Sequence, residues 1–184
     1  IYKYIDFIFN EKFSGKQYIL EKYKIWYQDL HENTNYFRGF SLKFFIPNLS
    51  SLIRDSNIHT ALDYGCGKAE LHETFRLKKL WGLHKLDKYD PGVKEWSDLP
   101  TSSYDLVFCI DVMEHIEDDD VDNILRHIYS LTNKIAFFSI STRPATKRLS
   151  DGTNVHKAIH PEQWWRDRID VVFKDKLAIV NFSL

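Results

Sequence analysis

The chain has 184 residues, of which 43% are hydrophobic and 28% are charged, and this fits one domain, residues 1–184, with one substantial core. Its net charge of −1 lacks the basic excess of general nucleic-acid-binding proteins, although a local basic patch is not excluded. No apolar run reaches the roughly 18 residues of a membrane span, so we expect no membrane contact. The spacing of the two cysteines, Cys66 and Cys109, indicates no pairing, which favours reduced thiols and a cytoplasmic protein.

The first 57 residues have the pattern of helices. Residues 16–32 carry apolar side chains at helical spacing, and residues 41–55 predict a second helix that Ser41 can cap and Pro47 can kink or break. We therefore expect a helical cap over residues 1–57. Its aromatic side chains can be core packing or a lid, and the sequence leaves both open; they are Tyr18, Tyr23, Trp26, Tyr27, Tyr36, Phe37 and Phe40.

Strands and helices alternate in the remaining part, residues 58–184. Short apolar runs predict strands at residues 60–64, 83–89, 104–110 and 134–141. Between them, helical patterns cover residues 68–78 and 118–132. This alternation predicts a doubly wound α/β core, in which a mostly parallel sheet has helices on both faces.

The C-terminal end contains two more strand-like runs, at residues 169–173 and 177–184. Only Lys174-Asp175-Lys176 separates them, and so short a link between strands permits only an antiparallel hairpin. We therefore expect one reversed strand near an edge of the sheet.

A glycine turn follows the first predicted strand, in the run Asp63-Tyr64-Gly65-Cys66-Gly67. Ligands of doubly wound sheets bind beyond the carboxyl ends of the strands, and bare glycine backbone lets a ligand approach closely. A dinucleotide also needs a small third residue, where this chain has Glu70, so a diphosphate is disfavoured. Asp63 instead suits a cofactor with an ammonium and a sulfonium. These features indicate S-adenosylmethionine, with a nicotinamide-dependent oxidoreductase as the weaker alternative.

This turn resembles the first motif of class I S-adenosylmethionine-dependent methyltransferases. Residues 104–116 (Tyr-Asp-Leu-Val-Phe-Cys-Ile-Asp-Val-Met-Glu-His-Ile) are very similar to the family's fourth-strand signature. The resemblance implies a Rossmann-like sheet of seven strands. A narrower resemblance links residues 23–165 to small methyltransferases of phages and bacteria, through pieces such as Phe37-Arg38-Gly39-Phe40-Ser41 and Trp164-Trp165. It names no acceptor.

The resemblance also implies contacts with the cofactor. In this family the acid that ends the second strand takes the ribose hydroxyls, which favours Asp90 over Asp87, although the spacing from Asp63 is longer than usual. Asp98 and Leu99 lie in the segment that resembles the adenine-lining one, and a plain polar loop is the equal alternative. The expected cofactor-binding residues are Asp63, Tyr64, Gly65, Gly67, Asp90, Pro91, Asp98, Leu99 and Asp111.

Asp111 lies where the resemblance places the methyl group and the incoming acceptor. Methyl transfer needs alignment and exclusion of water, and a general base only where the nucleophile keeps its proton. The candidate catalytic residues are Asp111, His115 and His156, while the alternative is that Glu114 and His115 cap the next helix or brace the loop. The run from Asp111 to Asp118 differs at two positions from the metal-binding run Glu-x-x-Glu-His-x-x-His of RNA 3′-end methyltransferases. Asp111 replaces the first glutamate and Asp118 replaces the final histidine, so we expect no metal.

The long segment from residue 141 to residue 165 has the character of a functional loop. Arg143 and Arg148 suit an anionic ligand, and Arg143, His156 and His160 are the expected substrate-binding residues. We therefore expect methyl transfer to oxygen or nitrogen of a small acceptor that can be anionic, and not to duplex DNA. A cofactor-binding protein without transfer and a methyltransferase of a nucleic-acid end are the alternatives, and the oligomeric state is left open.

Overall fold

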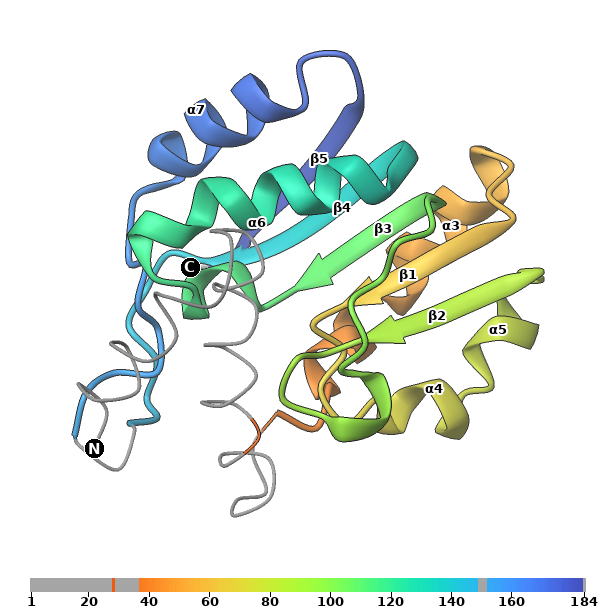
Figure 1. Ribbon diagram of the computed structural model, residues 1–184. Coiled ribbons are helices and arrows are strands. Elements are labelled where there is room, and N and C mark those ends of the chain that lie inside the picture. The colour runs from red at the N-terminus through yellow and green to blue at the C-terminus, as the bar shows by residue number, and fades with distance from the viewer. Residues whose placement is uncertain (1–27, 29–36, 149–151, 184) are drawn as a thin grey trace.

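The computed structural model of the chain describes residue 28, residues 37–148 and residues 152–183. Within these residues, one sheet contains five strands in the order β2-β1-β3-β4-β5, and every neighbouring pair is parallel (Figure 1). The strands are β1 (Thr60–Tyr64), β2 (Lys85–Tyr89), β3 (Tyr104–Ile110), β4 (Thr132–Ser141) and β5 (Leu177–Ser183). The expected α/β sheet is confirmed, but the described part of the chain supplies five strands to it and not seven.

Helices cover both faces of the sheet (Figure 1). One face carries α6 (Asp118–Leu131) and α7 (Glu162–Val172), and the other carries α3 (Ile46–Asp55), α4 (Glu70–Thr74) and α5 (Leu77–Leu80). Successive side chains of β3 serve both layers: Val107 and Cys109 pack on the α6 side, whereas Leu106 and Phe108 pack on the α3 side. Burial on both faces is the reason why the strands are apolar throughout.

The expected C-terminal hairpin is wrong. Residues 169–172 are the end of α7, and β5 pairs parallel with β4 along residues 177–183. The buried side chains Trp165, Ile169 and Phe173 are four residues apart, so they form one stripe on a helix that faces the sheet. The short link therefore joins a helix to a strand, which places no antiparallel constraint on the pairing.

The expected helix over residues 68–78 is interrupted. Ala69 and Arg76 both have left-handed backbone angles, with φ of 50° and 48°. Ala69 thus ends the glycine turn before α4 begins, and Arg76 separates α4 from α5. Residues in this conformation cannot continue a right-handed helix.

The described N-terminal part forms a short 3-10 helix, η1 (Phe40–Phe44), followed by α3. Pro47 lies in the first turn of α3, where its missing N–H has no helical partner to lose, so it begins the helix and does not break it. Ser41 falls inside η1 and does not cap α3. The helix expected over residues 16–32 lies outside the described residues, except for residue 28.

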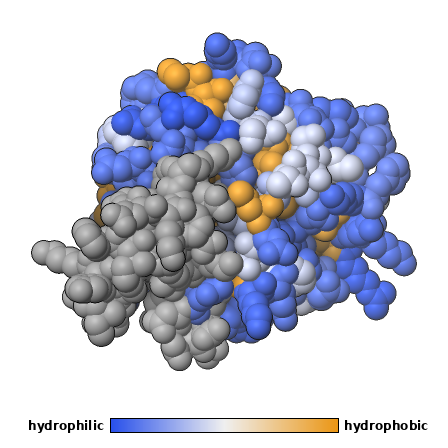
Figure 2. Space-filling model, in the orientation of Figure 1, coloured by the Kyte–Doolittle hydropathy of each residue, from blue (hydrophilic) through white to orange (hydrophobic). Residues whose placement is uncertain are grey.

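The apolar side chains are concentrated in the two layers between helices and sheet. Figure 2 shows one face of the molecule, on which hydrophilic residues dominate and apolar residues form small separate groups. In the described part of the chain, no helix has both the length and the apolar character that crossing a membrane requires.

The winding direction of the sheet changes at β1, because both β2 and β3 pair with it. Residues 65–67 follow β1 and Asp111 follows β3, at the edge toward which the strand arrows point (Figure 1). Doubly wound sheets bind ligands in the crevice at such a switch point. The fold therefore places the glycine turn and Asp111 at the expected ligand-binding edge.

Candidate cofactor and acceptor site

A cavity of 580 Å³ opens at this edge of the sheet. Its walls come from residues 37–42, 63–67, 89–91, 110–112, 114–116, 141 and 143–147, joined by Ile124, Val155, His156 and Ser183. The turns after four different strands thus contribute to one space, whose size is typical of small-molecule sites.

The glycine turn forms one wall of the cavity. Gly65 and Gly67 have φ of 83° and 57°, a region that favours glycine. A Cβ on Gly65 would lie 2.3 Å from Val112, and one on Gly67 would lie 2.1 Å from the carbonyl oxygen of Phe37. The carbonyl of Tyr89 accepts the N–H of Gly65 at 2.7 Å, so the neighbouring strand fixes the turn. Both positions therefore require glycine.

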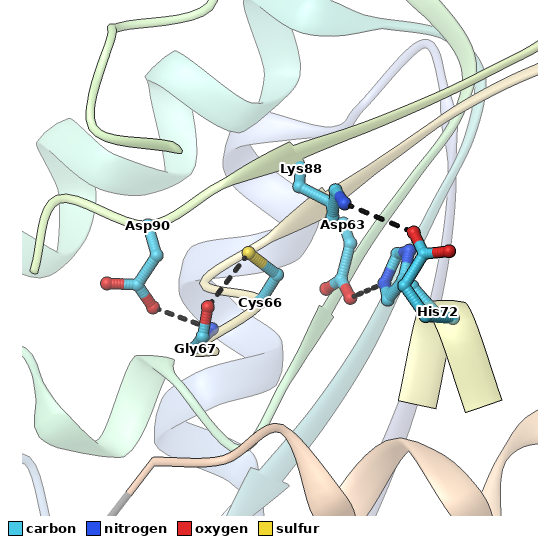
Figure 3. Close-up of polar contacts among 7 residues, drawn as sticks. Asp63, Cys66, Gly67, His72, Lys88 and Asp90 are labelled. Atoms are coloured by element: carbon cyan, nitrogen blue, oxygen red, sulfur yellow. Dashed lines mark hydrogen bonds and ion pairs between the residues drawn. The ribbon is translucent and has the colours of Figure 1, made fainter. Parts of the chain in front are cut away.

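Asp90 lies against this turn, at the end of β2 (Figure 3). Its Oδ2 accepts the N–H of Gly67 and its Oδ1 accepts the N–H of Gly92, both at 2.8 Å. The carboxylate is only 8% exposed, and Asp90 lines the cavity. Asp87, the alternative, accepts instead from the hydroxyl of Tyr104 at 2.6 Å and is not in the cavity wall. The structure therefore places Asp90, and not Asp87, where a ribose could reach it.

Asp63 is a buried acid paired with a histidine of α4 (Figure 3). His72 Nε2 donates to Asp63 Oδ2 at 2.7 Å, and both residues are buried. Burial raises the pKa of Asp63, and the hydrogen bond from His72 opposes this shift. The pair keeps an acid beside the glycine turn inside the protein, in the wall of the cavity.

Residues 37–39 form a strap that lies across the glycine turn. The carbonyl of Phe37 accepts the N–H of Lys68 at 3.0 Å, and a Cβ on Gly39 would lie 2.7 Å from the carbonyl oxygen of Cys66. Arg38 makes two bonds to the carboxylate of Glu70, at 2.7 and 2.6 Å. Glu70, the residue that disfavours a diphosphate, thus holds the strap to α4.

The strap also contacts His115, in the turn that follows β3. The ring of Phe37 meets the ring of His115 edge to face, with centroids 5.3 Å apart. Phe37 and Phe40, the two members of the expected aromatic group that the structure describes, both line the cavity. The other aromatic residues of that group lie outside the described residues.

Asp111 follows β3 in a strained conformation, with φ of 54°. Two bonds to Ser139 of β4 hold it there: its N–H donates to the Ser139 carbonyl at 2.9 Å, and its Oδ1 accepts the Ser139 hydroxyl at 2.8 Å. Asp111 lines the cavity at the switch point of the sheet. Its carboxylate therefore has a fixed position at the centre of the site.

Glu114 is a site residue that the sequence did not single out. It is 0% exposed yet lies in the cavity wall, and its Oε1 accepts the N–H of Ser141 at 2.9 Å. Burial, followed by the charge of Asp111, raises the pKa of Glu114 to about 8. The sequence showed only a glutamate before a histidine near a helix start, a pattern that gives no sign of burial.

The rings of His115 and His156 are in edge-to-face contact in the cavity wall, with centroids 4.9 Å apart. His115 Nδ1 donates to the carbonyl of Val155 at 2.9 Å, and His156 Nδ1 donates to the carbonyl of Arg143 at 2.6 Å. Burial, followed by the charge of His156, lowers the pKa of His115 to about 4. His115 is therefore neutral at physiological pH, with its remaining lone pair on Nε2.

The wall that follows β4 is cationic. Arg143 and Lys147 both line the cavity and are exposed. Asn154 holds this segment: its Oδ1 accepts the N–H groups of Ala145 at 3.1 Å and of His156 at 2.9 Å. This arrangement keeps Arg143 and His156 on the same side of the cavity.

Four of the expected residues have their side chains elsewhere. His160 bonds Asp118 at 2.8 Å and stacks on Trp164, and Arg148 donates to the carbonyl of Gly152. Asp98 and Leu99 are not among the described residues that line the cavity, and neither are His160 and Arg148. Tyr64 does line it, but its hydroxyl lies 2.9 Å from His127 Nδ1, in the core under α6.

The residues present fit S-adenosylmethionine. The cavity has a wall of bare main chain, in which a Cβ has no room, and the carboxyl groups of Asp63 and Asp90 on the same side. Carboxylates suit a ligand with an ammonium, a sulfonium and ribose hydroxyls better than they suit a diphosphate. Within the described ranges, no group of three or more His, Cys, Asp or Glu residues is arranged to hold a metal ion.

Known proteins resemble this chain in sequence and in fold. A family model described as a methyltransferase domain matches residues 20–171. Among solved structures, the chain is similar to DhpI in a complex with SAH, with 16% sequence identity and a TM-score of 0.51, over 84% of this chain and 87% of that chain. It is also similar to an O-methyltransferase family protein from Burkholderia thailandensis, with 12% identity and a TM-score of 0.42, over 87% of this chain and 52% of that chain.

No curated relative matches the sequence. The family match nevertheless covers most of the chain, and the first structural similarity supports the same fold. The chain therefore belongs to this methyltransferase domain family and is a class I S-adenosylmethionine-dependent methyltransferase.

Proposed function

We propose that the enzyme transfers a methyl group to an oxygen or nitrogen atom of a small acceptor that carries an anionic group. This proposal rests on the different chemical character of the residues on the two sides of the cavity. One side has bare glycine backbone and acids, which suit a cationic cofactor, and the other has Arg143, Lys147 and His156, which suit an anion. A volume of 580 Å³ favours a small acceptor.

The residues on the glycine-turn side of the cavity bind and orient the cofactor. When bound, S-adenosylmethionine supplies a methyl group on a positively charged sulfur, and loss of that charge drives the transfer. Asp90 offers its carboxylate oxygens to the ribose hydroxyls while it keeps its bond to Gly67. Asp63, paired with His72, presents an acid toward the ammonium side. Gly65 and Gly67 let the main chain come close to the ligand.

The acceptor side aligns the nucleophile and excludes water. Arg143 and Lys147 attract the anionic group of the acceptor, and the rings of Phe37, His115 and His156 close the space around it. Holding the two partners in line and away from water is the main contribution that a methyltransferase has to make.

Binding and turnover measurements test this function. Calorimetry is expected to show micromolar binding of S-adenosylmethionine to the wild type, and a loss of at least about tenfold in Asp90→Ala. Release of S-adenosylhomocysteine is then measured with a panel of small carboxylates and phosphate esters that carry a hydroxyl or an amine. The absence of binding heat in the wild type would contradict the proposal.

Arg143→Ala is expected to raise KM for the anionic acceptor by at least about tenfold, because it removes a charge that attracts the acceptor. It should change the affinity for S-adenosylmethionine by less than about threefold. Arg54→Ala is the matched control, since Arg54 is exposed and pairs with its neighbour Asp55 outside the cavity wall. Equal effects of the two variants on KM would contradict the proposed anion site. Product with single-stranded oligonucleotides alone would favour a nucleic-acid end, and binding without any product would favour a protein that lacks transfer activity.

A further inference from the structure

Glu114 has a buried carboxyl oxygen with no partner. Oε1 accepts from the N–H of Ser141, but no hydrogen-bonding group of the described residues reaches Oε2. An unsatisfied buried polar atom costs about 1–3 kcal/mol, more when it is charged. Glu114 is also among the residues that line the ligand cavity, so a role for this oxygen in contact with a ligand can explain why it has no partner in the protein.

The main chain around Glu114 fixes the position of this carboxyl group. The Glu114 carbonyl accepts the N–H of Lys157 at 2.7 Å and that of Ala158 at 3.1 Å. Together with the bond from Ser141, these contacts join the turn after β3 to the end of β4 and to the segment before α7. The main chain of Glu114 and one of its carboxyl oxygens are thus held in place, while the other carboxyl oxygen has no partner.

We infer that Glu114 is the general base of the reaction and takes, through Oε2, the proton of the acceptor's hydroxyl or amine; this role rests on the proposed function. The acceptor's O–H or N–H bond breaks, and its proton goes to Oε2. A lone pair of that oxygen or nitrogen forms the bond to the methyl carbon, while the carbon–sulfur bond breaks and its electron pair stays on sulfur. No further reactant is needed for the atoms and electrons to balance.

The electrostatics of the site suit this role. A base works best when its pKa is close to the working pH, and the pKa of Glu114 is raised to about 8. A positive charge in the same cavity favours the ionised carboxylate and lowers this pKa. The titratable and charged groups on the segments packed around Glu114 are Cys109, Asp111, His115, Arg143, Lys147, His156 and Lys157.

His115 is a weaker candidate for the same step. Its Nδ1–H is committed to the carbonyl of Val155, and its pKa is lowered to about 4. A group with so low a pKa has little affinity for the proton of a hydroxyl or an amine at neutral pH. His115 therefore serves to shape the cavity, through its contacts with Phe37 and His156, rather than to remove the proton.

This assignment narrows the class of acceptor. A general base is useful only if the nucleophile keeps its proton at neutral pH. The methyl group is therefore transferred to a hydroxyl or an amine, and not to the anionic group that Arg143 and Lys147 attract. The acceptor is a small molecule that carries both groups.

The first experiment needs no acceptor. Calorimetry at about pH 8, in buffers of different protonation enthalpy, measures the protons released when S-adenosylmethionine or S-adenosylhomocysteine binds. The cationic ligand is expected to release a larger fraction of a proton than the product, whose sulfur is neutral. Glu114→Gln has the same shape and no such proton, so the difference should vanish while the affinity for S-adenosylmethionine changes by less than about threefold.

Glu162→Gln is the matched control, because Glu162 is a half-exposed acid on α7 that pairs with Arg166 outside the cavity wall, and this variant should behave as the wild type. Equal proton release with the two ligands in the wild type would overturn the inference. So would an unchanged difference in Glu114→Gln.

The second experiment uses an acceptor from the panel that yields product. Glu114→Gln is expected to lower kcat by at least about 100-fold with little change in KM, and to remove the rise of kcat with pH that ionisation of Glu114 causes. A kcat within about tenfold of the wild type, with that rise retained, would overturn the inference. If Glu114→Gln does not fold, Glu114→Asp takes its place and should keep the pH dependence at a lower kcat; loss of that dependence would overturn the inference.

These outcomes separate the two proposals. Failure of the wild type to bind S-adenosylmethionine or to form product counts against the proposed function. Binding and turnover without the proton release or the pH dependence of Glu114 count against the general base alone.

Discussion

Gly67 and Gly82 both have left-handed backbone angles, with φ of 57° and 62°, but only Gly67 is in a crowded place. A Cβ at Gly67 would lie 2.1 Å from the Phe37 carbonyl oxygen, whereas a Cβ at Gly82 would meet nothing within 4 Å. Gly82→Ala should therefore cost only the backbone strain, about 1–2 kcal/mol of unfolding free energy in urea titrations. Gly67→Ala should cost more and weaken S-adenosylmethionine binding at least about tenfold by calorimetry. Equal effects of the two variants would contradict the tight contact between strap and turn.

The raised pKa of Glu114 leads us to expect an unusual pH dependence of the free energy of unfolding. Its pKa is raised from 4.5 to about 8 in the folded protein, so between these values the folded chain holds a proton that the unfolded chain has released. The free energy of unfolding should therefore fall as the pH rises through this window, by at most about 5 kcal/mol. Urea unfolding of the wild type and Glu114→Gln at several pH values measures this slope. The variant should show a flatter profile, and identical profiles would rule out a protonated Glu114 in the folded state.

At the scale of single residues, the sequence predicted the cavity residues that belong to recognisable local motifs. The glycine turn and Asp63 are at the cavity, as their place after the first strand implied, and so is Asp90, which the family resemblance had indicated. Glu114 was expected only as a structural residue beside His115, because its place in the cavity wall depends on burial and on a missing partner, which only the tertiary structure creates. His160 was singled out for its residue type, and its partner Asp118 on α6 became visible only in the fold.

At the scale of elements, the strap should couple the N-terminal region to cofactor binding. Arg38 and Glu70 are partly exposed, so their pair should add little to stability. It nevertheless holds residues 37–39 across the glycine turn. Arg38→Ala should weaken S-adenosylmethionine binding by roughly three- to tenfold, because a looser strap leaves Phe37 less ordered before binding.

Charge reversal provides the control for this prediction. Arg38→Glu alone should weaken binding at least as much as Arg38→Ala, and combining it with Glu70→Arg should restore most of the affinity. Calorimetry on the single and double variants gives the coupling between the two residues. Affinities that simply add, with no recovery in the double variant, would show that the ion pair does not hold the strap.

The elements that were predicted incorrectly share one physical cause. Residues 169–173 are apolar enough for a strand, but their period continues from Trp165 and is helical. Likewise, the helical pattern over residues 68–78 contains Arg76, whose left-handed conformation is uncommon for a residue with a side chain and has no signal in the sequence. Short apolar runs do not distinguish a strand from a buried helix unless their period is followed over a longer stretch.

At the scale of the whole molecule, ligand binding should stabilise the fold as a unit, because the cavity is built from the turns after four strands. At a concentration of S-adenosylmethionine 100 times its Kd, binding contributes about 2.7 kcal/mol. For a chain of this size, the expected rise in Tm is roughly 5–10 °C, measured by calorimetric or fluorescence melting. Asp90→Ala should show a smaller rise at the same concentration. A Tm that is independent of ligand would contradict the cofactor site.

The overall architecture was predictable because it follows from the alternation of strands and helices along the chain. Strand, helix and strand in sequence leave few arrangements besides a doubly wound sheet, and the five described strands obey that rule without exception. The number of strands was not predictable in the same way. It was taken from a resemblance, and nothing in the local pattern of residues 142–176 requires another strand.

The contact between the glycine turn and Asp90 depends on strand register and not on the length of chain between them. β1 and β2 are paired residue for residue, from Thr60 opposite Lys85 to Tyr64 opposite Tyr89. The exposed turn at Gly82, where an added side chain has open space, is not part of the cavity wall. Insertions at this turn can therefore lengthen the sequence between Asp63 and Asp90 without moving either acid. The same tolerance makes this turn a suitable point for attaching a fluorescent label that reports on the enzyme without disturbing it.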